Sequence, residues 1–164
     1  MEKDPIRITY EKLERNTLIL IACSIPFFAV VYLYSQSESI TRTSYNLPEI
    51  ADFILLGLIY VLLAFHYWNF HNAIKNILTL NPDLETKITL YEQATIRRFW
   101  ILLLSSVLCP LGLLLFENNG YIIAYALTLV FLSLGKPTPD RIVRLLRLKG
   151  EEKDRVIKIK TREG

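Results

Sequence analysis

The fold is decided by residues 53–74, FILLGLIYVLLAFHYWNFHNAI, and residues 99–116, FWILLLSSVLCPLGLLLF, neither of which contains Asp, Glu, Lys or Arg. Each stretch is long enough to cross the ~30 Å hydrocarbon core of a bilayer, because an α-helix rises about 1.5 Å per residue. The residues between the two stretches are polar and contain Asn81-Pro82-Asp83. The pattern predicts two membrane-spanning helices (spans) joined by a polar helical hairpin.

The hairpin is expected to stand out of the membrane, with its tip over residues 71–97. Apolar residues continue at helical spacing on both sides of Asn81, so both helices should extend past the bilayer by roughly 15–20 Å. Asn81 is the predicted N-cap of the second hairpin helix, with Pro82 at its first position and Asp83 in its opening turn.

Two further uncharged blocks complete a four-span membrane domain over residues 17–137. The spans are expected at about 17–36, 50–70, 98–116 and 120–135, with kinks at Pro26 and Pro110. The last block is the shortest, and a re-entrant segment is the alternative there. Of the 164 residues, 52% are hydrophobic, and they are pooled in these blocks rather than spread in stripes, which excludes an ordinary soluble domain. The fold class is therefore an all-α integral membrane bundle.

Polar segments flank the membrane domain: a leader over residues 1–16, a loop over 38–47 and a basic tail over 138–164. In the tail, Thr138 is a predicted helix start and Gly150 a predicted stop. The helix between them would place Ile142, Leu145, Leu146 and Leu148 on an apolar side. Its basic side chains are candidate contacts for anionic lipid headgroups or for a partner protein; they are Arg141, Arg144, Arg147 and Lys149. A short ribbon pairing strands at 6–10 and 156–160 is an alternative for the two ends.

The basic residues predict the orientation of the chain. The leader, residues 71–98 and the residues from Lys136 onward contain 18 of the 19 Lys and Arg residues, and the other two loops contain only Arg42. Since positive charge is retained in the cytoplasm, both termini and the hairpin are expected there, in a plasma (inner) membrane.

His66 is the one ionisable side chain expected deep inside a span, which makes it the first candidate for function. His71 follows on the same helix, but five residues apart the two side chains point about 140° from each other. One subunit therefore cannot provide two facing haem ligands, and the spacing does not suit a metal site. We expect His66 to hydrogen-bond another helix and His71 to join Tyr67 and Trp68 in an aromatic belt at the membrane interface.

No sequence motif identifies a reaction, a cofactor, a metal site or nucleic-acid binding. We therefore expect a non-enzymatic multi-pass protein that scaffolds or accompanies a larger membrane complex, with lipid and a membrane-protein partner or a second copy as its contacts. The alternative is an oligomeric pore or small transporter with Pro26 and Pro110 as hinges and His66 as the polar contact. Its remaining lining could come only from tyrosines and from Ser24, Ser105, Ser106, Thr128 and Ser133.

Overall fold

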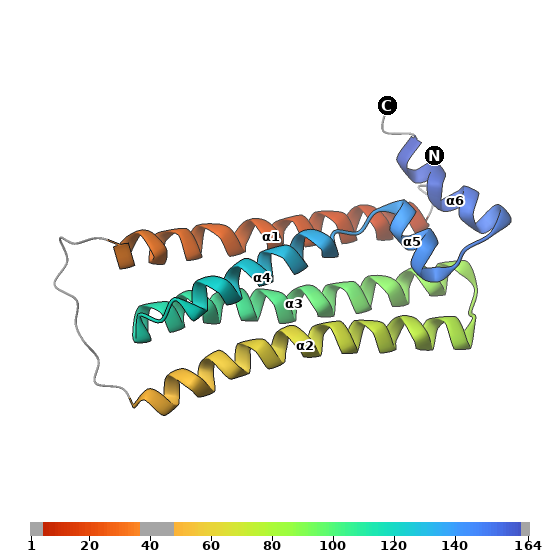
Figure 1. Ribbon diagram of the computed structural model, residues 1–164. Coiled ribbons are helices and arrows are strands. Elements are labelled where there is room, and N and C mark those ends of the chain that lie inside the picture. The colour runs from red at the N-terminus through yellow and green to blue at the C-terminus, as the bar shows by residue number, and fades with distance from the viewer. Residues whose placement is uncertain (1–4, 37–47, 162–164) are drawn as a thin grey trace.

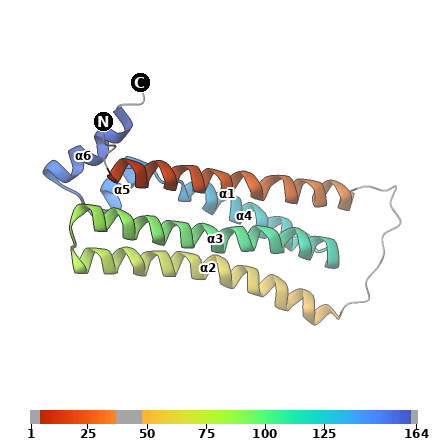
Figure 2. The same cartoon turned by 180° about the vertical axis from the view of Figure 1, so that it is seen from behind.

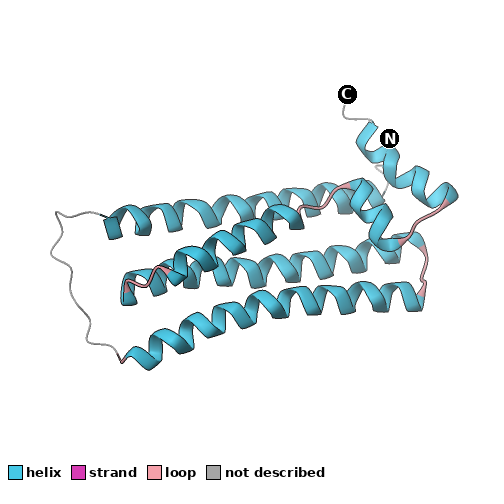
Figure 3. Ribbon diagram, in the orientation of Figure 1, coloured by secondary structure: helices cyan, strands magenta, loops and turns pink. Residues whose placement is uncertain are grey.

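The computed structural model describes residues 5–36 and 48–161, and these residues form only helices and connecting turns (Figure 3). The predicted loop over 38–47 lies outside the described residues. The all-helical fold class is confirmed. The helices are α1 (Pro5–Gln36), α2 (Glu49–Leu80), α3 (Leu84–Phe116), α4 (Gly120–Gly135), α5 (Pro139–Leu146) and α6 (Gly150–Thr161).

Helix α3 is the centre of the bundle. It packs against α1, α2 and α4, and Figures 1 and 2 show the four long helices running side by side while α5 and α6 cover one end. The shared core contains Ile59 and Leu63 of α2, Leu102 of α3, and Tyr125 and Leu132 of α4. Ring stacking between Phe28 and Tyr125 also joins α1 to α4.

Helices α1, α2 and α3 are each long and apolar enough to cross a membrane. Helix α4 has 16 residues, and it reaches the required length only together with α5, from which it is bent by 86°. Apolar side chains also cover much of the outer surface: Val30, Phe53 and Val61 are each more than 60% exposed. An apolar surface of this extent is typical of helices that face lipid.

A second hydrophobic core lies at the end of the bundle where α5 and α6 pack. It contains residues from α1, α2, α3, α5 and α6, among them Leu13, Ile77, Ile88, Ile142 and Val156. We call this end the cap, formed by residues 5–15, 71–97 and 138–158. Two ion pairs hold its helices to α3: Lys87–Glu152 at 3.4 Å and Lys12–Glu92 at 3.8 Å.

The opposite end of the bundle is tied together by Asp52 at the start of α2. Its carboxylate accepts hydrogen bonds from Asn118 Nδ2 at 2.6 Å and from the Tyr121 hydroxyl at 2.7 Å. These bonds connect the start of α2 to the turn between α3 and α4. The acidic side chain thus lies at the end of the apolar segment and is hydrogen-bonded there.

The turn between α2 and α3 differs in detail from the prediction. Asn81 has a left-handed φ of 41° and ends α2, its N–H donating to Ile77 O. Asp83, rather than Asn81, is the N-cap of α3, because its side chain accepts from the Thr86 N–H at 3.2 Å. Pro82 stands between the two caps, where its missing N–H breaks no helical bond.

Three predictions for the chain ends are wrong. Residues 6–10 and 156–160 belong to α1 and α6, so neither segment is a strand. Apolar and polar residues alternate in both segments, as they do in strands. Both segments are nevertheless helical, because Ile6 and Val156 are buried in the core of the cap as side chains of helices. Gly150 does not end the basic helix: α5 ends at Leu146, and Gly150, with a φ of 54°, begins α6.

Candidate functional site

His66 is fully buried among α2, α3 and α4. Its ring packs edge-on against Phe131 of α4, with 4.9 Å between the ring centroids. The expected hydrogen bond to another helix is not formed, since both ring nitrogens lack a partner within the described chain. The sequence therefore identified a buried polar side chain correctly but not its surroundings.

Arg98, directly before the uncharged stretch of α3, is the second polar group at this site. It is only 6% exposed. Its guanidinium lies 5.0 Å from the centre of the Phe70 ring, and Nη2 donates a long hydrogen bond of 3.5 Å to Phe131 O. Nε has no partner, and no ion pair joins Arg98 to a described carboxylate.

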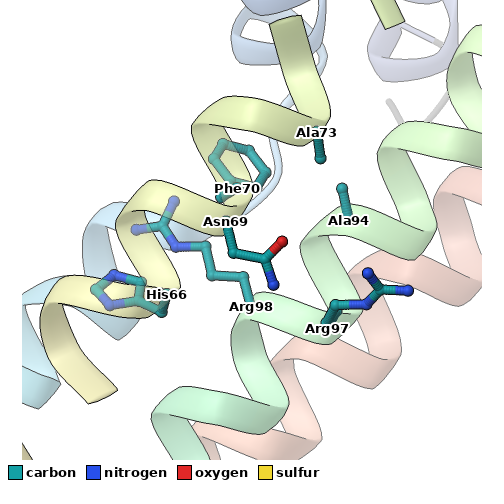
Figure 4. Close-up of a pocket in the computed structure, with 7 residues that line it drawn as sticks. All are labelled: His66, Asn69, Phe70, Ala73, Ala94, Arg97 and Arg98. Atoms are coloured by element: carbon teal, nitrogen blue, oxygen red, sulfur yellow. The ribbon is translucent and has the colours of Figure 1, made fainter. Parts of the chain in front are cut away.

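A small cavity of about 20 Å³ lies between α2 and α3 at these side chains. Figure 4 shows the Arg98 guanidinium directed toward His66, with the Asn69 amide beside it, whereas Arg97 points to the other side of α3. A cavity of this size can hold about one water molecule. Its lining is His66, Asn69, Phe70, Ala73, Ala94, Arg97 and Arg98.

A larger groove of about 230 Å³ continues along the α2–α3 seam into the cap. It shares Ala73, Ala94 and Arg97 with the small cavity, and the two alanines leave space between the helices. Leu80 stands at the far end and is 73% exposed. The remaining lining side chains are Asn76, Ile77, Leu90 and Gln93.

The basic side chains of the tail lie at the surface of the cap, apart from Arg141. Arg141 is half-buried and close enough to Arg98 for their positive charges to repel. Arg144, Arg147 and Lys149 are exposed. The apolar side of the same segment packs inward, however: Ile142, Leu146 and Leu148 are at most 5% exposed and belong to the core of the cap.

The remaining candidates provide no reactive arrangement. His71 is exposed and stacks on Tyr67, with 6.3 Å between the ring centroids. Cys23 and Cys109 are both free thiols. Within residues 5–36 and 48–161, no three His, Cys, Asp or Glu side chains lie close enough to hold a metal ion.

Arg98 is the residue of this site that the sequence analysis did not single out. The Arg97-Arg98 pair seemed only to close the start of a span. A signal was nevertheless present, because Tyr91, Thr95 and Arg98 follow each other at helical spacing and therefore share one face of α3. Tyr91 and Thr95 belong to the apolar stripe, so Arg98 is carried into the interior with them.

No protein-family model, no curated protein and no solved structure matches this chain. The function is therefore argued from the geometry of the bundle, the cap and the groove between α2 and α3.

Proposed function

We propose that this chain is a non-enzymatic accessory or scaffold subunit of a membrane complex, and that a partner protein docks on the cap. The observation that carries the proposal is the groove of about 230 Å³ along the α2–α3 seam. It is open and smaller than the roughly 300–1,000 Å³ of pockets that enclose small ligands. It suits a few side chains of a helix laid along it.

The partner is expected to present an amphipathic helix with acidic residues beside its apolar face. Ile77, Leu80 and Leu90 provide apolar contacts in the groove. The segments predicted to lie on the same side of the membrane as the cap contain 18 Lys and Arg residues against 12 Asp and Glu residues, whereas those predicted on the other side contain 1 against 4. An acidic partner is therefore attracted to the cap. Arg144, Arg147 and Lys149 add exposed positive charge for the same partner or for anionic headgroups.

The proposed topology has four spans, with both termini and the cap in the cytoplasm of a plasma (inner) membrane. It rests on the distribution of Lys and Arg. The charged residues that bound α4 also support a complete fourth crossing. Arg98 precedes Glu117 by 19 positions, and Glu117 precedes Lys136 by 19 positions, so the two uncharged segments are equally long, although two residues of the second lie in the turn before α4.

The hydroxyl groups of the bundle favour this role over the pore alternative. Ser24, Ser105, Ser106 and Thr128 are buried, and each donates a hydrogen bond to a carbonyl of its own helix. These four hydroxyl groups are thus hydrogen-bonded within their own helices, while the outward faces that could meet a second copy are mostly apolar, with scattered hydroxyl groups such as those of Tyr60 and Ser133. Neither the buried hydroxyl groups nor the outward faces of the helices provide the polar path that an ion or solute requires.

The proposal is tested by purifying the tagged, full-length chain from its own membranes in mild detergent, and by measuring its native mass and its co-purifying proteins. A stoichiometric partner is expected. Leu80→Glu should remove it, because a carboxylate is placed in the groove. Ile8→Glu is the matched control: Ile8 is 49% exposed on α1 and lies outside the groove. A homo-oligomer that carries only lipid would contradict the proposal and favour the pore.

A further inference from the structure

The cavity beside Arg98 is surrounded by hydrogen-bond donors. A guanidinium has five N–H groups, and in Arg98 they make one long bond, to Phe131 O, while Nε makes none. His66 has two unpartnered ring nitrogens in the same wall, and Asn69 and Arg97 complete it. None of the described residues that line the cavity is an Asp or a Glu. The acceptors at the site are neutral ones, Asn69 Oδ1, one nitrogen of a neutral His66 ring and Phe131 O, and no anionic group of the described lining faces the guanidinium.

The charge balance indicates that the group missing from the site is negative. Burying a guanidinium without a counter-charge costs several kcal/mol, and the contact with the Phe70 ring offsets only part of that cost. The nearby charge of Arg141 adds repulsion. An anion in the cavity would replace the lost hydration and reduce this repulsion.

The position of the cavity relative to the membrane indicates where the anion comes from. Trp68 and Trp100 are 63% and 59% exposed and stand two residues from His66 and Arg98 along their helices. Exposed tryptophans mark the level of the headgroups in membrane proteins. The cavity therefore faces the layer that contains the phosphate groups of phospholipids.

The size of the cavity sets how an oxyanion would bind. About 20 Å³ admits a single oxygen atom next to Arg98, and the cavity continues past Ala73, Ala94 and Arg97 into the groove. The remaining oxygens would lie at this mouth, beside Asn69 and beside Arg97, whose side chain lines both spaces and would turn its guanidinium toward them from the direction seen in Figure 4. Guanidinium groups match the oxygen spacing of phosphate and bind it through parallel hydrogen bonds.

We propose that Arg98, together with His66, Asn69 and Arg97, binds a phosphate oxyanion, supplied by a phospholipid headgroup or by free phosphate. This site is distinct from the predicted headgroup contacts on the tail, and it does not depend on a partner protein. Its oxyanion neutralises the buried guanidinium and so holds α2, α3 and α4 together at the membrane surface.

The test uses native mass spectrometry of the full-length chain in detergent, titrated separately with phosphatidylglycerol and with inorganic phosphate. One tightly retained phosphate species per chain is expected. Arg98→Gln should weaken its binding at least tenfold. Arg15→Gln makes the same chemical change at an exposed position of α1 and should leave binding unchanged. If Arg98→Gln does not fold, Arg97→Gln replaces it, since Arg97 is exposed, and a severalfold loss is expected.

The two titrations distinguish the sources. Retention of phosphatidylglycerol that inorganic phosphate does not displace assigns the site to a lipid headgroup, and binding of inorganic phosphate alone assigns it to the free ion. Binding of both that is unchanged by the folded Arg98 or Arg97 variant would overturn the proposal. Binding of neither would also overturn it, as would a partner carboxylate cross-linked to this cavity in the purified complex.

Discussion

Gly112 sets how closely α3 and α4 approach each other. A Cβ atom at this position would lie 2.6 Å from Tyr121 Cδ1 and would overlap neighbouring atoms of the same ring. Tyr121 cannot move easily, because it is fully buried and its hydroxyl donates to the Asp52 carboxylate. One missing side chain in α3 thus allows α4 to be tied to the start of α2.

Gly112→Ala is therefore expected to destabilise the folded chain by about 1–3 kcal/mol, the usual cost of overpacking a core. Gly57→Ala is the matched control, because nothing lies within 4 Å of the Cβ that it adds, and alanine is favoured over glycine in a helix by about 0.5–1 kcal/mol. The melting temperatures of the purified variants in detergent measure both effects. Equal melting temperatures for the two variants would contradict this account of the α3–α4 contact.

At the scale of the elements, the α2–α3 turn combines two caps within three residues. Asn81 ends one helix in a left-handed conformation, and Asp83 begins the next by accepting hydrogen bonds from the Thr86 hydroxyl and N–H. These hydrogen bonds from Thr86 hold the pKa of the Asp83 carboxyl below its ordinary value of 3.8. The turn is therefore stabilised by the ionised form of Asp83.

The sign of the resulting pH dependence follows from this lowered pKa. The contribution of Asp83 is present above the pKa of the unfolded chain and is lost as the pH falls through the lower pKa of the folded chain. Asp83→Asn is the control, since it keeps a capping oxygen but does not titrate. The natural chain should lose melting temperature relative to Asp83→Asn as the pH is lowered from about 6 to about 3. If the difference in melting temperature between the natural chain and Asp83→Asn did not change with pH, the ionised Asp83 carboxylate would not stabilise the turn.

The helices could be predicted because their signals are local. Uncharged length identifies the long apolar segments, and Thr138 caps α5 as expected, its hydroxyl accepting from the Arg141 N–H. The secondary structure of the chain ends was harder to predict. Apolar and basic residues alternate over 156–160, which fits a strand, whereas the packing of the cap favours a helix. The burial of Arg98 was indicated by its spacing from Tyr91 and Thr95, but the surroundings of its guanidinium could not be predicted. They depend on where Phe70 and Phe131, on two other helices, come to lie.

The whole molecule has two cores, and both α2 and α3 contribute buried residues to each of them. The apolar core of the bundle and the core of the cap both include residues of α3, which also carries the cavity between them. The sequence is strongly asymmetric in charge, because the segments predicted on the side of the cap contain 18 of the 19 Lys and Arg residues. The proposed orientation of the chain in the membrane rests on this asymmetry of charge.

Labelling of single cysteines tests that orientation. In a chain in which Cys23 and Cys109 are replaced by alanine, Asn119→Cys should react with a membrane-impermeant maleimide in intact cells. Glu85→Cys should react only after the cells are permeabilised, because positive charge keeps the cap in the cytoplasm. Both positions are exposed, so accessibility of the side chain does not distinguish them. Reaction at Glu85→Cys in intact cells would contradict the orientation.

The central position of α3 also determines the order in which the protein can be assembled during translation. Helices α1 and α2 leave the ribosome before the helix that both pack against has been made. The hydrogen bond from the Tyr125 hydroxyl of α4 to the Ser24 carbonyl of α1 can form only later, after α4 has been made. A nascent chain that stops after α2 therefore lacks the helix around which the bundle packs. Folding of this bundle cannot be complete before α4, the last of its four helices, has been made.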